Sequence, residues 1–127
     1  MNELSADDRL SLLRIVAEYA HVMDSRDFQG LDRIFSRDAQ FDATAFGVAR
    51  CNDLGEIIAL MTSETRHPVA HHTTDVMVCQ AGHRSATLRS KGLAVSTLGT
   101  VTSLVYLDVA VLTDDGWRIQ SRIARPL

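Results

Sequence analysis

The N-terminal part of the chain has the apolar pattern of a helix, and most of the sequence typical of strands follows it. Up to about Ser25, apolar side chains recur at the spacing of a helix, whereas from Val69 onward β-branched residues and spaced turns predominate. Alternating helices and strands would build parallel βαβ units, so this segregation predicts an α+β fold instead. The chain has 127 residues and no Pro/Gly/Ser-rich linker, so residues 1–127 are expected to form a single domain.

The expected elements follow the order ααβαββββ. The first helix is capped by Ser5 or Asp7 and ends near Ser25, and a short second helix follows Asp27. The later elements are a strand over 39–46, a helix from Asn52, and strands over 70–79, 84–98, 101–112 and 117–124. The first helix is expected to be buried along Leu13, Val16, Ala17 and Ala20.

Composition and charge exclude several classes of protein. The net charge is −3 and Lys91 is the only lysine, so the clustered cations that bind nucleic acid are missing. No apolar run approaches the roughly 18 residues of a membrane-spanning helix, and the acidic N-terminal sequence is unlike a signal peptide. Cys51, Cys79 and the five histidines form no metal-binding motif. We expect a cytoplasmic protein that needs no metal or cofactor and binds neither nucleic acid nor membrane.

Asp24 is the most informative polar residue of the first helix. It follows Ala20 by four residues, Ala17 by seven and Leu13 by eleven, so it projects from the expected apolar side. A carboxylate in apolar surroundings requires a partner. Asp24 therefore either pairs with a polar group of the interior or ends the helix by bonding to Arg26 or to backbone.

Two adjacent histidines open the strand expected over 70–79. In a regular strand, His71 shares one face with Thr73 and Asp75, and His72 shares the other with four largely apolar residues. These four residues are Ala70, Thr74, Val76 and Val78. The more apolar face is expected to be the inner one, which favours His72, although a one-residue shift would exchange the two histidines.

Three stretches of the chain resemble the SnoaL-like family, which belongs to the nuclear transport factor 2-like superfamily. They are YAHVMDSRDFQGLDRIFSRDAQFD at 19–42, AHHTTDV at 70–76 and TDDGWRIQSR at 113–122. The resemblance implies a cone, in which a curved mixed sheet wraps around the N-terminal helices and encloses one apolar pocket. Members include scytalone dehydratase, a dehydrochlorinase, polyketide cyclases and ketosteroid isomerase, and others only bind ligands.

The resemblance also implies a catalytic pair. In the dehydratases and the dehydrochlorinase, an Asp at the end of the first helix and a His at the start of this strand form a dyad, and Asp24 and His72 match these positions. An aspartate that accepts the ring N–H fixes the tautomer and leaves the other nitrogen free to take a proton. Scytalone-type dehydration is not expected, because Met23 and Ala43 stand where that enzyme has tyrosines.

Five further residues are candidates for substrate binding: Tyr19, His71, Tyr106, Asp108 and Arg122. Tyr19 belongs either to the core or, through its hydroxyl, to the pocket. Tyr106 and Asp108 share a strand face that we take as the concave one. Asp108 is either a second pocket acid or the partner of Arg122. Arg122 matches a frequent arginine of the family's last strand, where a salt bridge is favoured over substrate binding.

These features predict a cofactor-free lyase or isomerase that acts on a small apolar or aromatic substrate. Dehydration, elimination, isomerisation and cyclisation all share the removal of a proton by a base. The alternatives are a non-catalytic small-molecule-binding domain with the same pocket and an assembly module whose cavity is filled. A homodimer through the outer sheet face is also expected, because four valines would otherwise expose an apolar patch. They are Val101, Val105, Val109 and Val111.

Overall fold

The computed structural model describes residues 4–127. Two α-helices, α1 (Ala6–Ser25) and α2 (Leu54–Ser63), accompany two 3₁₀ helices, η1 (Phe28–Arg33) and η2 (Thr44–Phe46). The strands are β1 (Phe35–Asp42), β2 (Ala70–Gly82), β3 (Ser85–Val95), β4 (Val101–Thr113) and β5 (Gly116–Pro126). The expected order of elements is confirmed, with three local corrections. The second helix is a 3₁₀ helix, and the first strand begins and ends four residues earlier than predicted. Helix α2 is capped by Asp53 and not by Asn52.

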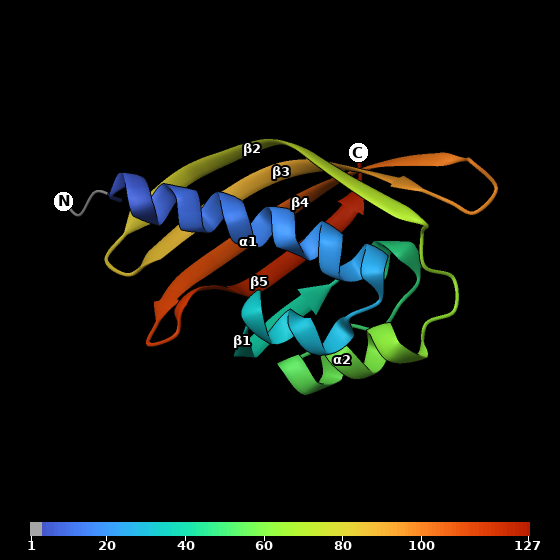
Figure 1. Cartoon of the computed structure of the whole chain (residues 1–127), viewed down its shortest axis with the longest axis horizontal. Coiled ribbons are helices and arrows are strands. Elements are labelled where there is room, and N and C mark those ends of the chain that lie inside the picture. The colour runs from blue at the N-terminus through green and yellow to red at the C-terminus, as the bar shows by residue number, and fades with distance from the viewer. Residues whose placement is uncertain (1–3) are drawn as a thin grey trace.

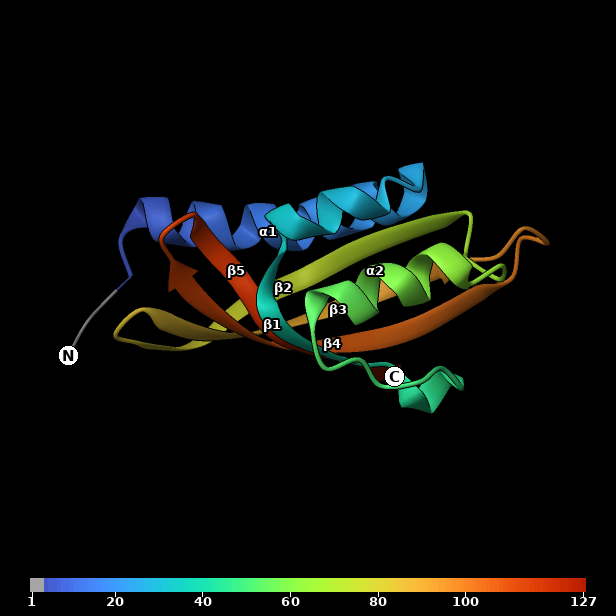
Figure 2. The same ribbon diagram turned by 90° about the horizontal axis from the view of Figure 1, so that it is seen from below.

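All strands belong to one curved sheet in the order β1-β5-β4-β3-β2. β1 pairs with β5 in parallel, and the other pairs are antiparallel. α1 crosses one face of this sheet along its length, and α2 lies beside β1 (Figures 1 and 2). The predicted α+β cone is therefore confirmed, except that it is not a closed barrel. In the described part of the chain, β1 and β2 remain as separate edges.

The helix α1 is held at its start by a capping box. The Ser5 hydroxyl accepts the backbone N–H of Asp8 at 3.0 Å, and the Asp8 carboxylate accepts the backbone N–H of Ser5 at 3.1 Å. The Asp8 carboxylate also accepts the Trp117 indole N–H at 2.9 Å, which ties the helix to β5. Neither α1 nor any other helix within residues 4–127 combines the length and apolar character needed to cross a bilayer.

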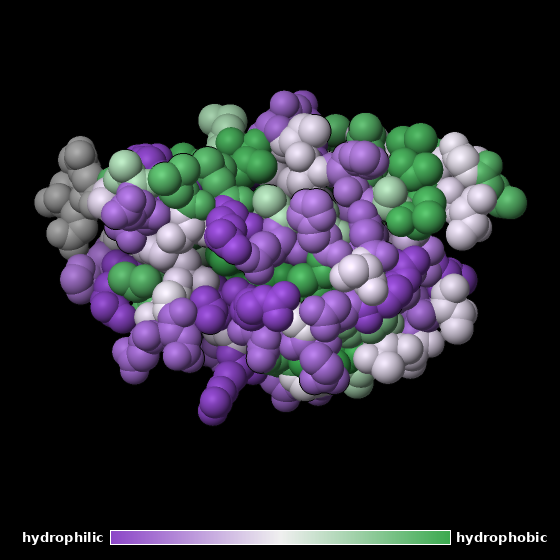
Figure 3. All heavy atoms as spheres, in the orientation of Figure 1, coloured by the Kyte–Doolittle hydropathy of each residue, from purple (hydrophilic) through white to green (hydrophobic). Residues whose placement is uncertain are grey.

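The buried side of α1 lies about a quarter turn from the predicted one. Val16 and Ala20 are buried as expected, but Leu13 and Ala17 are exposed. The buried side instead centres on Leu12, Ile15, Val16, Tyr19, Val22 and Met23. Apolar side chains are consequently visible along the upper side of the molecule, where α1 and β2 lie (Figure 3).

The outer face of the sheet is less apolar than the sequence predicted. Val101 and Val109 are exposed, but Val111 is half-buried and Val105 is already buried within one chain. The exposed apolar side chains of this face are accompanied by Arg89, Lys91 and Arg125, which are also exposed.

A β-bulge near Asp75 changes which side chains of β2 face inward. From Thr74 to Met77, β2 advances three residues while its partner β3 advances two, and Asp75 has φ 55°. Residues on the inner face therefore have odd numbers before the bulge, such as His71 and Thr73, and even numbers after it, such as Val76. The sequence alone treats β2 as regular and misses this change.

Substitution at Asp75 tests the bulge. We expect Asp75→Val to lower the free energy of unfolding by about 1–2 kcal/mol, because a β-branched side chain is strained at positive φ. Asp75→Gly should be at least as stable as the parent chain, since the Lys91 ion pair that it loses is exposed and 3.6 Å long. Thr74→Val, at the neighbouring regular position, is the control. Urea unfolding measures all three, and equal stability of the two valine variants would contradict the bulge.

Candidate active site

A cavity of about 330 Å³ lies between the end of α1, α2 and the concave face of the sheet. Its walls are mainly apolar, with aromatic rings on several sides. The apolar lining includes Phe41, Phe46, Leu60, Met61, Leu104 and Ala124. Polar groups reach it from Tyr19, His71 and Tyr106, and from the segment 64–68 at its rim. A mostly apolar cavity with a few converging polar groups is typical of a small-molecule site.

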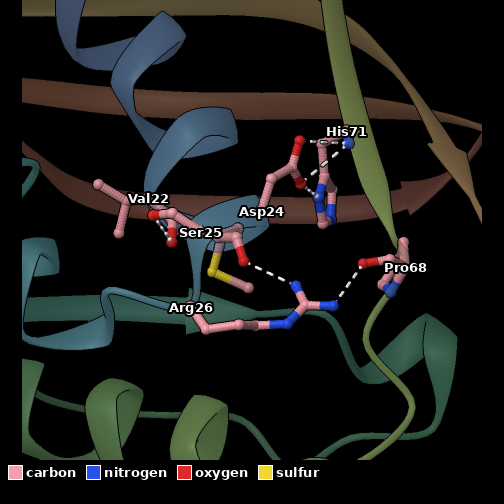
Figure 4. A network of polar contacts seen from close by, with 7 residues as sticks. Val22, Asp24, Ser25, Arg26, Pro68 and His71 are labelled. Carbon is pink, nitrogen blue, oxygen red and sulfur yellow. Dashed lines mark hydrogen bonds and ion pairs between the residues drawn. The ribbon is translucent and has the colours of Figure 1, made fainter.

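Asp24, in the last turn of α1, binds His71, the second residue of β2 (Figure 4). The His71 ring Nδ1 lies 2.7 Å from Asp24 Oδ1, and the backbone N–H of His71 donates to both carboxylate oxygens at 3.0 Å. The imidazole lines the cavity and is 10% exposed, and it lies roughly perpendicular to the Tyr19 ring, with the ring centres 6.3 Å apart. Because Nδ1 is engaged by the carboxylate, Nε2 is the nitrogen available to a ligand.

The prediction that His72 faces Asp24 is wrong. His72 is exposed on the outer face of the sheet, opposite Leu93 of β3, whereas His71 lies opposite the pocket residue Ala94. In a regular strand, Val76 and Val78 would share a face with His72, but the bulge at Asp75 breaks that alternation. The alternative that the sequence left open, an exchange of the two histidines, is the arrangement that the structure has.

An ion pair is buried beneath the pocket. Arg122 donates from Nε and Nη2 to the Asp108 carboxylate at 2.8 and 2.9 Å, and both side chains are fully buried. The guanidinium carbon lies 4.4 Å from the centre of the Tyr19 ring and 4.1 Å from that of Tyr106. Of the two alternatives for Asp108, the structure has the pairing with Arg122. Neither residue lines the cavity, because Tyr19 and Tyr106 cover them.

The burial of these groups shifts their proton affinities. Burial raises the pKa of Tyr19 and of Tyr106 above the ordinary tyrosine value. Burial alone would lower the pKa of Arg122, but the adjacent Asp108 carboxylate outweighs it, so the guanidinium pKa is raised. At neutral pH the two tyrosine hydroxyls are therefore protonated, and both residues line the cavity.

The rim of the pocket was missed by the sequence analysis. We define the rim segment as residues 64–69, which connect α2 to β2 without regular secondary structure. The Glu64 carboxylate accepts the backbone N–H and the guanidinium of Arg66, and these hydrogen bonds lower the pKa of Glu64 to about 2. His67 Nε2 lies 2.7 Å from the Met61 carbonyl oxygen, and its ring packs on Phe28 at 5.1 Å. Nothing in the spacing of these residues indicated a pocket.

The family model for the SnoaL-like domain matches residues 5–123. The chain belongs to this family. Many solved structures also share the fold of this SnoaL-like chain. No curated protein sequence matches it.

Three solved structures illustrate how widely the fold of this SnoaL-like chain is shared. One, provisionally described as an aromatic ring hydroxylase of Novosphingobium aromaticivorans, has a TM-score of 0.80 and 23% identity over 98% of this chain and 92% of that one. Another from that bacterium, provisionally described as a scytalone dehydratase, has a TM-score of 0.79 and 18% identity over 97% and 89%. A cystatin-like protein of unknown function from Nostoc punctiforme has a TM-score of 0.83 and 18% identity over 99% and 96%. These likenesses show the fold alone.

The site residues of this SnoaL-like chain are groups that can transfer protons. Within residues 4–127, no three His, Cys, Asp or Glu side chains gather closely enough to hold a metal ion. The pocket combines an imidazole fixed by a carboxylate, two protonated phenols and apolar walls. This arrangement can bind an apolar molecule and can accept a proton from it at His71 Nε2.

Removal of Asp108 tests the buried ion pair. We expect Asp108→Ala to lower the free energy of unfolding by about 3–5 kcal/mol, because the Arg122 charge would remain buried without a counter-ion. Arg14→Ala is the control, since its 2.7 Å pair with Glu18 is exposed and should contribute less than about 1 kcal/mol. Denaturant unfolding of both variants measures the difference. Equal losses would mean that the pair at Arg122 is not buried.

Proposed function

We propose that the chain is a cofactor-free enzyme of the lyase or isomerase type, acting on a small apolar or aromatic substrate. The observation that carries this proposal is the 2.7 Å contact between His71 Nδ1 and the Asp24 carboxylate at the edge of an apolar cavity. His71 is the general base, and Asp24 orients its ring. The SnoaL-like family and its fold are compatible with this chemistry but do not select it, since one fold supports many reactions.

In this proposal, the reaction begins when His71 Nε2 removes a proton from a carbon atom of the substrate. The imidazolium that forms keeps its Nδ1 proton and donates it in a hydrogen bond to Asp24, which remains a carboxylate and stabilises the ring charge. The hydroxyls of Tyr19 and Tyr106, which stay protonated because their pKa values are raised, can donate to an oxygen that gains negative charge. The carbanion or enolate then expels a leaving group, migrates its double bond or closes a ring.

The other acids near the pocket are poorly suited to act as this base. Glu64 is held by Arg66, and its pKa of about 2 makes it a weak proton acceptor. Asp108 is covered by the tyrosines and engaged by Arg122. His67 also lines the cavity, but its ring bonds to the Met61 carbonyl and not to a carboxylate that could stabilise an imidazolium. His71 is therefore the strongest candidate for proton abstraction.

Elimination of nitrobenzisoxazole provides a test that needs no knowledge of the natural substrate. A base removes the ring C–H proton of this apolar aromatic compound, the N–O bond breaks, and a coloured cyanophenolate forms. We expect His71→Ala to lower kcat/KM by about a hundredfold or more, because general-base catalysis typically contributes that much. His72→Ala, at the adjacent exposed position, should retain the parent activity. Equal activity of the two variants would remove the catalytic assignment.

The contacts of Asp24 also allow a purely structural role, since it accepts the backbone N–H of His71 as well as its ring. If Asp24 is only structural and His71 is not a base, the pocket binds small molecules without converting them. The double variant Asp24→Asn/His71→Ala distinguishes the two roles. If Asp24 and His71 act as a unit, its elimination rate should equal that of His71→Ala. Binding of the probe without any histidine-dependent turnover would favour the non-catalytic domain.

We also propose that two copies associate through the outer sheet face, where Met77, Val101 and Ile123 are 61%, 58% and 39% exposed. Light scattering at tens of micromolar protein should give the mass of a dimer, and Ile123→Asp should give a monomer. Leu10→Asp is the control, because Leu10 is an equally apolar exposed residue on α1. The cations Arg89, Lys91 and Arg125 would repel across such an interface, so added salt should strengthen it. A monomeric parent chain would refute this association.

A further inference from the structure

Arg26 connects the end of α1 to the wall of the pocket. Its Nη1 donates to the Met23 carbonyl oxygen at 2.7 Å, and its Nη2 donates to the Pro68 carbonyl oxygen at 2.9 Å (Figure 4). Pro68 belongs to the rim segment and itself lines the cavity. One guanidinium thus joins two backbone groups that are far apart in the sequence, using its rigid fork of donors.

The backbone of Arg26 is unusual for an arginine. It has φ 62° and ψ 25°, the left-handed conformation, and it ends α1 in a pattern that glycine normally occupies. The N–H groups of Arg26 and Asp27 bond back to the carbonyls of Met23 and Val22. Glycine would adopt this conformation without strain. The presence of a long cationic side chain at this position points to a role for the guanidinium itself.

The rim segment has few other attachments. The N–H of Glu64 donates to a carbonyl of α2, and the N–H of Val69 donates to a carbonyl of β3. The His67 ring bonds to the Met61 carbonyl. Only Arg26, among the residues described, joins the middle of this segment to α1 through a side chain. The segment nevertheless contributes four residues to the cavity lining: Glu64, Arg66, His67 and Pro68.

We propose that Arg26 is a positioning residue of this site, which fixes the rim segment against α1 and thereby holds His71 in register with Asp24. Two tethers leave the last turn of α1, one from Asp24 to His71 and one from Arg26 to Pro68. Pro68 and His71, to which these two side chains bind, are three residues apart. Loss of either contact would therefore loosen the backbone at the other. The catalytic consequence of this role rests on the proposed function of His71, but the tether itself does not.

The β2–β3 turn supplies a matched comparison within the same chain. Arg84 also has a left-handed backbone, with φ 60°, and its Nη2 also donates to a backbone carbonyl, that of Leu112 at 2.9 Å. It does not line the cavity, and its turn lies at the end of the sheet away from α2 (Figure 1). Replacing either arginine by glycine relieves the backbone and removes one hydrogen bond to a distant segment, from Arg26 to Pro68 or from Arg84 to Leu112. Arg26→Gly also loses the local bond to Met23, and only this variant should affect the pocket.

The experiment compares Arg26→Gly, Arg26→Lys and Arg84→Gly by hydrogen exchange and by binding of naphthol, a neutral bicyclic aromatic probe. We expect Arg26→Gly to keep its thermal midpoint, because glycine suits the left-handed position. Exchange at the hydrogen-bonded amides of Val69 and His71 should accelerate roughly ten- to a hundredfold, since hydrogen bonds from a charged donor are lost. Naphthol should bind more weakly to this variant. Arg26→Lys should be intermediate, because one ammonium group cannot reproduce both arms of the guanidinium fork.

The tautomer of His71, observed through its ring nitrogen chemical shifts, gives a readout that a merely structural loss elsewhere would not change. The parent chain and Arg84→Gly should carry the proton on Nδ1, and Arg26→Gly should show a mixture of tautomers. Unchanged exchange and an unchanged tautomer in Arg26→Gly would overturn the proposal, as would the same loosening in Arg84→Gly. If Arg26→Gly loosens the rim while His71→Ala leaves elimination intact, the tether stands and the proposed catalytic function fails.

Discussion

The structure depends on the burial of one guanidinium between two aromatic rings and a carboxylate. Arg122 is anchored to Asp108 on the adjacent strand and stacks against Tyr19 from α1 and Tyr106 from β4. A buried charge is stabilised by a counter-ion in good hydrogen-bond geometry, which Asp108 supplies at Nε and Nη2. Among the described residues, Nη1 has no hydrogen-bond partner. The Arg122 guanidinium therefore fixes where α1 meets the sheet and supports Tyr19 and Tyr106, which form the floor of the pocket.

That floor explains why the pocket is open and not filled. The Tyr106 ring approaches β3 at Gly92, where an added Cβ atom would lie 2.8 Å from Tyr106 Cε2. A larger residue at Gly92 would push the ring away from the sheet and toward the cavity. The glycine keeps the tyrosine close to the guanidinium, and the space above it remains available to a ligand.

Much of the fold was predictable because its signals are local. The helical period of α1, the β-branched second half and the three motif stretches together indicate both the element order and the family. The identity of the pocket histidine was not predictable, because a single extra residue at Asp75 exchanges the faces of β2 without a strong sequence signal. The register of α1 was likewise misjudged, since Leu13 and Leu12 look equivalent until the sheet selects one. The rim segment was missed because its role depends on a tertiary contact from Arg26, 42 residues away from Pro68.

The parallel pairing of β1 with β5 has a consequence for how the chain is synthesised. Phe35 lies opposite Ile119, so β1 cannot pair with its neighbouring strand until β5 has also left the ribosome. Until then, β1 lacks its partner in the sheet, because β5 separates it from the other strands and is made after them. Contacts between distant parts of a chain slow folding and expose nascent strands to aggregation. Truncation near the C-terminus should accordingly unravel the first strand of the chain along with the last.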